Sequence, residues 1–157
     1  FYVIKDNLMR FYFTFLFGND GVISRIGDDA FYRQFVDGRL VEFISRRFED
    51  IVLQYFGRLA RTGQRTDIQD IGSYWYDDPV NKKNGEFDCV VKSSAGYEFY
   101  ECKFYQNPMT EQECHDEEEQ LKEIPGISHA VTGFVCSSGF DFKSDRYSMI
   151  TGEDLFS

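Results

Sequence analysis

The chain has 157 residues, a length that suits one domain with its own hydrophobic core. Its hydrophobic fraction of 42% and aromatic fraction of 18% exclude a disordered chain, because so many Phe and Tyr side chains must be hidden from water. The net charge of -10 is uneven: residues 1–65 carry ten Lys/Arg against eight Asp/Glu, and residues 66–157 carry seven against nineteen. Because phosphate neutralisation drives non-specific binding to nucleic acid, we expect any phosphate contacts in the first part.

No apolar run approaches the roughly 20 residues of a membrane span, and the opening lacks the zones of a signal peptide. The chain starts at Phe1, so we expect a piece of a longer protein. The cysteines show no CxxC spacing, which favours reduced thiols in a reducing cytoplasm. Cys114 and His115 are adjacent, but a zinc site is disfavoured because no second close pair exists.

Helical periodicity dominates the first part of the chain. A first helix is predicted between the capping candidates Asp6 or Asn7 and the terminating pair Gly18 and Asn19. Its apolar stripe is typical of core packing, with nucleobase stacking as the alternative reading. The stripe consists of Leu8, Phe11, Tyr12, Phe15 and Leu16.

A second helix is predicted over Asp28 to Val36, and Gly38 should separate it from a longer helix running from Arg39 to about Ala60. The long helix has a wide apolar stripe, so we expect it to be the central helix. That stripe comprises Leu40, Phe43, Ile44, Phe48, Ile51, Val52, Tyr55 and Phe56. Glu49 lies on its border and is placed to face a site carried by strands. We divide the chain into a helical segment, 1–37, and a domain, 38–157.

From Thr66 onward the pattern changes to short aromatic and β-branched segments. A three-strand meander is predicted, and its second connection, Ser93 to Gly96, is tight. The first connection is marked by Asp77, Asp78, Pro79, Asn84 and Gly85. The strands are 71–76, 86–92 and 97–105. A helix over 110–123, closed by Pro125 and Gly126, and strands at 129–137 and 147–151 complete a mixed α/β (α+β) arrangement.

Charged side chains collect on one face of this meander. Side chains alternate along a strand, so Glu86 and Asp88 should share one face while Phe87, Cys89 and Val91 share the other. On the next strand, Glu101 and Lys103 should point away from Tyr100, Cys102 and Phe104. Asp88 and Glu101 can then lie close across the ladder.

Acids inside apolar strands are costly unless they are paired or bind an ion, and their hard oxygens suit Mg2+ or Mn2+. The alternative is a solvated sheet face with a cross-strand Lys–Glu salt bridge. Spacing alone leaves both readings open.

An Asp on one hairpin strand followed by Glu-X-Lys on the next resembles the PD-(D/E)XK nuclease superfamily, matched here by Asp88 and by Glu101-Cys102-Lys103. Over nearly its whole length the chain also resembles the C-terminal domain of unknown function attached to archaeal-type AAA ATPases. The segments that carry this second resemblance are 3–13, 48–49, 71–75, 86–88, 101–103 and 137–140.

The resemblance implies a restriction-endonuclease-like fold, a mixed sheet of four to five strands flanked by helices. It also implies that Asp88 and Glu101 hold the cation, that Glu49 completes the site, and that Lys103 orients water or offsets charge. Glu86 is a second-rank candidate. The implied function is divalent-metal-dependent hydrolysis of phosphodiesters in nucleic acid, with DNA preferred, beside an AAA ATPase domain that precedes it in the same chain.

Two other functions remain open. One is a catalytically silent docking or regulatory module of the ATPase, and the other, less favoured because of the acidic surroundings, is a metal-independent nucleic-acid binder. Seven acids crowd the helix predicted over 110–123, which is typical of a solvated face, with a surface for a basic partner as the alternative. There is no phosphate loop, so this piece is not itself an ATPase.

Overall fold

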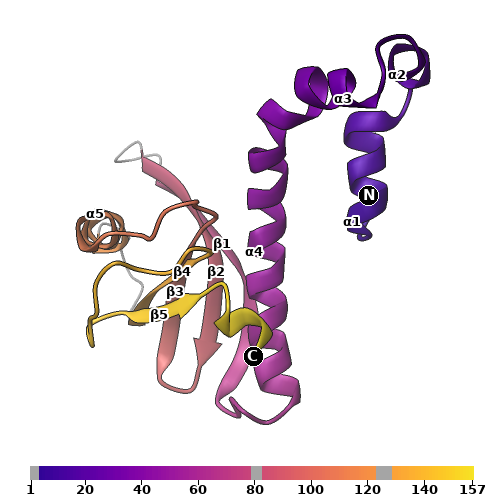
Figure 1. The fold of residues 1–157 in the computed structure, drawn as a ribbon. Helices are drawn as coiled ribbons and strands as arrows, with labels where there is room; N and C mark the ends of the chain where they lie inside the picture. The colour runs from indigo at the N-terminus through magenta and orange to yellow at the C-terminus, as the bar shows by residue number, and fades with distance from the viewer. Residues whose placement is uncertain (1–3, 79–82, 123–128) are drawn as a thin grey trace. The chain divides into compact units, whose positions relative to one another are not determined.

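The computed structural model describes residues 4–78, 83–122 and 129–157 (Figure 1). Contacts divide the chain into two units, and the division falls between Arg47 and Phe48, within helix α4 (Asp37–Arg61). No helix in these ranges combines the length and apolarity needed to span a membrane. The boundary expected after residue 37 stays a prediction.

The first unit is helical. Asp6 caps the first helix, since its Oδ1 accepts a hydrogen bond of 2.8 Å from the backbone N–H of Met9. The helix closes at Gly18, whose φ of 79° suits glycine. The elements are α1 (Asn7–Phe11), the π-helical turn η1 (Tyr12–Leu16), α2 (Asp20–Ile26), α3 (Asp28–Phe31), the π-helical turn η2 (Tyr32–Val36) and the start of α4. Their shared core is built on the buried side chains of Phe15, Phe31 and Val36.

The helices of the first unit differ from the prediction in two ways: one predicted break is absent, and one helix is additional. Gly38 does not separate helices, because α4 begins at Asp37 directly after η2 and runs through it. Glycine lowers helix stability by only about 1 kcal/mol, which the packed neighbours offset. Helix α2 was not predicted. Asn19 ends one helix and starts the next, because its carbonyl accepts from the N–H groups of Val22 and Ile23.

The second unit contains a five-stranded sheet in the order β1-β2-β3-β4-β5. The first three strands are antiparallel, and β4 and β5 add in parallel, so the predicted mixed sheet is confirmed. Ser93 pairs with Gly96 across the tight turn. The strands are β1 (Ile68–Asp78), β2 (Lys83–Ser93), β3 (Gly96–Lys103), β4 (His129–Cys136) and β5 (Ser148–Thr151). A 3-10 turn, η3 (Asp154–Phe156), follows.

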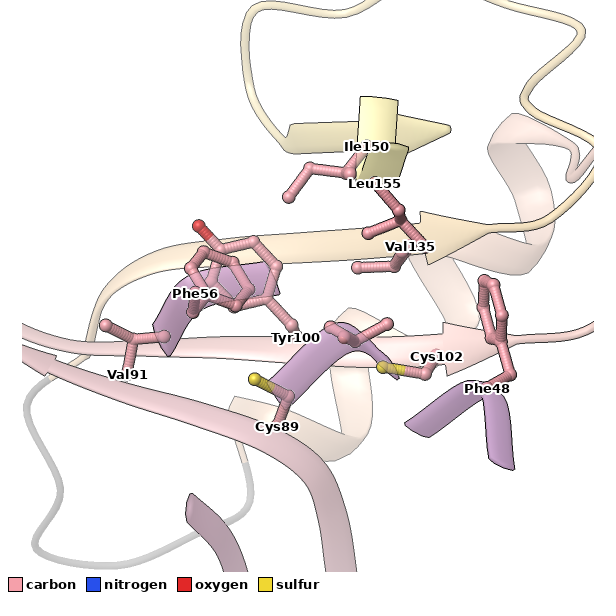
Figure 2. Packing of buried hydrophobic residues seen from close by; sticks show 10 residues of the cluster. Phe48, Phe56, Cys89, Val91, Tyr100, Cys102, Val135, Ile150 and Leu155 are labelled. Carbon is pink, nitrogen blue, oxygen red and sulfur yellow. The ribbon is translucent and has the colours of Figure 1, made fainter. Parts of the chain in front are cut away.

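Helices cover both faces of this sheet. On one face Phe48, Val52 and Phe56 of α4 pack with strand residues that include Cys89 and Tyr100 (Figure 2). On the other face lies α5 (Glu111–Lys122), which corresponds to the helix predicted over 110–123; Glu123, Pro125 and Gly126 lie outside the described residues. Its side chains pack in two groups: Leu121 with Phe87, Val90 and Phe99, and Cys114 with Phe134 and Cys136.

A β-bulge in β2 changes the expected alternation. Gly72 pairs with Val90 and Tyr74 pairs with Phe87, so two residues of β2, Asp88 and Cys89, oppose one residue of β1. Phe87 and Val90 therefore share the α5 face. The prediction that Phe87 faces with Cys89 and Val91 is wrong, because the extra residue inverts the strand at Asp88.

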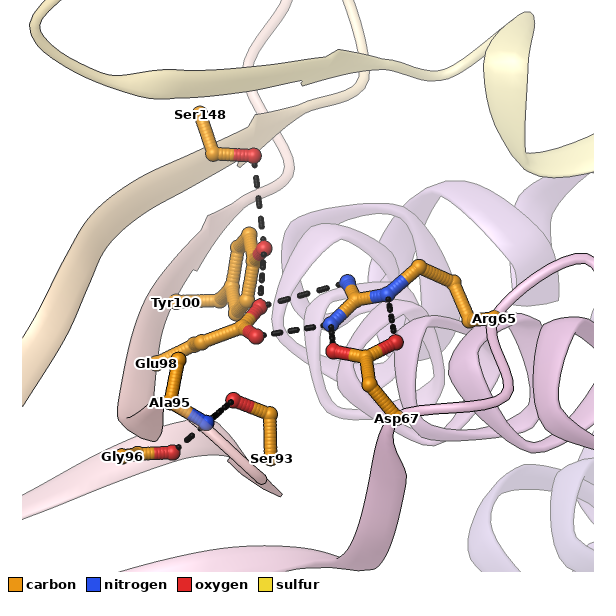
Figure 3. A network of polar contacts seen from close by, with 8 residues as sticks. All are labelled: Arg65, Asp67, Ser93, Ala95, Gly96, Glu98, Tyr100 and Ser148. Atoms are coloured by element: carbon orange, nitrogen blue, oxygen red, sulfur yellow. Dashed lines mark hydrogen bonds and ion pairs between the residues drawn. The ribbon is translucent and has the colours of Figure 1, made fainter.

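A partly buried ion-pair network joins the segment between α4 and β1 to β3 (Figure 3). The Arg65 guanidinium lies 2.7 Å from carboxylates of both Glu98 and Asp67. Glu98, only 5% exposed, also accepts a 3.0 Å hydrogen bond from the hydroxyl of Tyr100, which in turn lies 3.3 Å from the Oγ of Ser148. The hydrogen bonds that Arg65 donates to Asp67 and Glu98 raise its pKa, and the bond from Arg65 lowers the pKa of Asp67. The network therefore holds β3 against β5 and against the loop between α4 and β1.

We predict that Glu98→Ala lowers the free energy of unfolding by about 3 kcal/mol, because Arg65 and Tyr100 lose a buried partner. Urea denaturation measures this loss. The matched control is Glu42→Ala, which removes an exposed pair with Arg46 and should change stability by under about 1 kcal/mol. Equal losses in the two variants would contradict a structural role for the network.

Candidate functional site

The charged cluster forms where two central strands part. Pairing between β2 and β3 ends at Cys89 and Tyr100, while β2 continues alongside β1. Past this fork, the backbone N–H of Cys102 donates a 3.0 Å hydrogen bond to Oδ2 of Asp88. The Asp88 carboxylate thus takes the place of a ladder carbonyl, which orients it toward β3 beside Glu101.

Glu101 and Lys103 lie on the α5 face of β3. Their neighbours on β4, Phe134 and Cys136, pack with α5, and Cys102 packs with α4, as the alternation of β3 predicted. The Lys103 Nζ lies 2.8 Å from Oε1 of Glu101 and 2.8 Å from Oε1 of Glu117. All three side chains are largely buried, with exposures of 20%, 19% and 26% respectively.

Burial dominates the electrostatics of this cluster. Loss of solvent and the nearby charge of Asp88 raise the pKa of Glu101 to about 7, although Lys103 opposes the shift. Burial also raises the pKa of Asp88, and the Cys102 N–H offsets part of the effect. Lys103 is held in its charged form, because Glu101 and Glu117 raise its pKa against the effect of burial. The carboxylates of Glu101 and Glu117 therefore share the ammonium group of Lys103, and Asp88 lies close to Glu101.

The other two predicted acids, Glu86 and Glu49, lie on β2 and α4. Glu86 is exposed on the part of β2 that pairs with β1 at Trp75, and its charge contributes to the raised pKa of Asp88. Glu49 of α4 lies close enough to raise the pKa of the Cys102 thiol, whose side chain is on the α4 face. The structure thus brings Asp88, Glu101 and Lys103 together, and it places Glu49 on α4, near Cys102.

The sequence pattern gives no separate role to Glu117, because the acids of α5 together are typical of a solvated helix face. That prediction is wrong for two of them. Glu117 binds Lys103, and Glu118, only 8% exposed, binds Arg146 and accepts a 3.4 Å hydrogen bond from Tyr147. The charge run concealed these roles because Cys114 and Leu121 are the apolar residues of α5, too few for a clear stripe, and Glu117 and Glu118 lie between them.

A second acidic group lies on α5. Within the described residues, only His115, Glu118 and Glu119 bring three potential ligand atoms within 4.8 Å of one another. Their carboxylates already carry cationic partners: Glu118 binds Arg146, and Glu119 lies 2.6 Å from the Nζ of Lys122. Cys114 is buried beneath this group, and burial raises the pKa of its thiol to about 12, so it offers no thiolate.

Fold and site together define a mixed α+β domain that carries an acid and lysine cluster at the fork of its central strands. The chain belongs to DUF234, a family of archaeal and bacterial proteins of unknown function, whose model matches residues 12–117. The matched range includes every residue of the cluster, from Glu49 to Glu117. No curated protein and no solved structure matches the chain.

We predict that Glu101→Gln stabilises the fold near pH 8. The folded-state pKa of about 7 exceeds the value of about 4.3 for an unfolded Glu, so stability falls as pH rises between these values. Removing the charge should raise the free energy of unfolding by on the order of 2 kcal/mol near pH 8 and by little near pH 4. Thermal unfolding at both pH values measures the difference.

The exposed Glu111 provides the control, since Glu111→Gln should shift stability by less than about 0.5 kcal/mol at either pH. Destabilisation by Glu101→Gln near pH 8 would show that the Lys103 ion pair outweighs the cost of burying the charge.

Proposed function

We propose that the chain is a divalent-metal-dependent phosphodiester hydrolase acting on nucleic acid, with DNA as the preferred substrate. One observation carries the proposal: Asp88 and Glu101 lie together at the strand fork, largely buried, with Lys103 beside them. Burying two carboxylates is unfavourable unless a cation compensates for it. Such unfavourable charge placement is a common sign of a functional site.

The donor set suits Mg2+ or Mn2+. These ions prefer oxygen ligands and typically use one or two carboxylates, with waters and substrate phosphate oxygens completing the shell. A carboxylate has about four lone-pair sites, so the hydrogen bonds that Asp88 accepts from Cys102 and Glu101 accepts from Lys103 leave acceptor capacity on both groups as far as the described residues go. When bound, such a cation supplies Lewis-acid polarisation of the phosphate and activation of the attacking water. We assign Asp88 and Glu101 as its ligands.

Lys103 acts in this proposal as an electrostatic stabiliser. Because its pKa is raised, it stays protonated at neutral pH and cannot serve as a general base. Its ammonium group offsets the negative charge that develops on the phosphate during hydrolysis. Glu117 holds the ammonium from the α5 side and Glu101 holds it from β3, which fixes its direction. Glu49, on the α4 side, is kept as a candidate for completing the ligand shell, and Glu86 remains second rank.

A second candidate function is a docking or regulatory module of an AAA ATPase domain that precedes this chain. The observation that favours it is the number of apolar side chains exposed in the first unit, where Leu8 is 75% exposed, Phe17 61% and Val41 53%. Patches of this kind commonly mark contacts with other proteins. In that case the strand fork retains its acids without cutting nucleic acid.

Calorimetric titration with Mn2+ tests the metal site. We predict binding near pH 8 that weakens near pH 5.5, because protonated Glu101 is a poor ligand. Asp88→Asn should abolish binding, whereas Glu111→Gln, which alters an exposed acid outside the proposed site, should leave it within about threefold. Binding that survives Asp88→Asn would place the ion elsewhere.

Cleavage assays test the reaction. Plasmid, branched and single-stranded DNA and RNA are incubated with the chain in Mg2+, Mn2+ or EDTA. We predict metal-dependent cleavage that Lys103→Ala lowers by roughly 100-fold or more while Mn2+ binding persists. Metal binding without cleavage of any of these substrates would favour the docking module, and equal cleavage by wild type and Lys103→Ala would reject the assigned role of the lysine.

A further inference from the structure

An arginine-lined groove lies wholly within the first unit. It has a volume of about 490 Å3 and is bordered by η1 and the start of α4. Four of its lining residues are arginines and one is an acid, Glu42. The arginines are Arg10, Arg39, Arg46 and Arg47. The unit as a whole has seven Lys/Arg against six Asp/Glu, so the positive charge is gathered at this groove.

Aromatic rings hold two of these guanidinium groups. The Arg39 guanidinium carbon lies 5.4 Å from the centre of the Phe15 ring, and that of Arg47 lies 5.7 Å from the Phe43 ring. At the exposed Arg39, this contact restricts the guanidinium plane while leaving its edge able to donate hydrogen bonds. A preordered fork of donors matches the oxygens of a phosphate.

Arg46 is the most easily redirected of the four. It lies 2.9 Å from Glu42 one helical turn away, and the two side chains are 67% and 70% exposed. An exposed pair of this kind contributes little, so a phosphate can compete with the carboxylate for Arg46. Arg39 and Arg46 are seven positions apart on α4, about two helical turns, which places them on one side of the helix.

We propose that this groove binds the backbone of a single-stranded nucleic acid. The arginines contact successive phosphates, and Phe13, which lines the groove and is 46% exposed, offers a ring on which an unpaired base stacks. A duplex or an acidic polypeptide would engage the charges but gain nothing from this ring. The remainder of the chain carries ten Lys/Arg against twenty-one Asp/Glu, so the groove is where a polyanion meets least repulsion.

Single-stranded nucleic acid would then be the form of substrate for the proposed hydrolase, and this step rests on that proposed function. The binding test does not require hydrolase activity. Fluorescence anisotropy with labelled oligothymidylate of about 15 nucleotides, in EDTA, measures binding without cleavage. Asp88→Asn, which removes a proposed metal ligand, should leave this affinity unchanged. A failed metal site and a failed groove are thereby distinguished.

We expect Arg39→Gln with Arg46→Gln to weaken binding at least about tenfold. The double variant should also make the affinity less sensitive to salt, with the slope of log K against log salt falling by about 0.7 for each phosphate of the single strand that is no longer neutralised. The matched control, Arg25→Gln with Arg33→Gln, removes the same charge from exposed positions of the same unit that do not line the groove and should change affinity by about twofold or less. Arg46→Gln alone, at an exposed position, gives a second variant whose folding is not in question.

Phe13→Ala should weaken oligothymidylate binding about tenfold and leave binding to duplex unchanged. Three results would overturn the proposal: absence of binding, equal losses in the groove and control variants, or displacement of oligothymidylate by polyglutamate as readily as by unlabelled oligothymidylate. The last would identify the groove as a contact for an acidic protein segment.

Discussion

The geometry of the site depends on the hydrogen bond that the backbone N–H of Cys102 donates to Asp88. This bond closes the fork left when β2 departs with β1, and it needs the β-bulge that turns Asp88 out of the regular alternation. One backbone donor thereby fixes a carboxylate next to Glu101, whose own position is set by the parallel pairing of β3 with β4. Shifting the bulge by one residue would send Asp88 to the other face.

The cluster is placed at the expense of stability. Burial and the Asp88 charge hold the Glu101 carboxyl partly protonated at neutral pH. Among the described residues, the ammonium group of Lys103 compensates for these acids and is shared with Glu117. A structural ion pair would be arranged differently, as the Arg65 network shows: there the buried Glu98 meets an arginine at two oxygens and a tyrosine hydroxyl. The contrast between the two sites, one satisfied and one short of positive charge, is why we assign a cation to the fork and a structural role to Arg65.

Much of the fold follows from the sequence because local rules governed it. Asp6 caps its helix, Ser93 and Gly96 close the hairpin, and the period of β3 assigns Glu101 and Lys103 to one face and Tyr100 and Cys102 to the other. The failures came where tertiary packing overrode those rules. The bulge at Asp88 requires knowledge of the register with β1, and the continuity of α4 through Gly38 goes with the packing of Val36 and Leu40 in the core of the first unit.

The site was predictable in part for the same reason. Asp88, Glu101 and Lys103 lie on adjacent strands joined by a short turn, so their proximity is predictable, although the bulge that orients Asp88 is not. Glu117 reaches Lys103 only because of how α5 packs over the sheet. The role of Glu49 as a further ligand is implied by the resemblance alone and stays a prediction, since its described effect is the one on the Cys102 thiol.

The position of a bound ion tests most directly whether Asp88 and Glu101 form a metal site. Crystals of the chain soaked with Mn2+ near pH 8 allow the ion to be located by its anomalous scattering. The account predicts a peak between the carboxylates of Asp88 and Glu101 that is lost in Asp88→Asn crystals. A peak confined to His115, Glu118 and Glu119, or no peak at the strand fork, would contradict it.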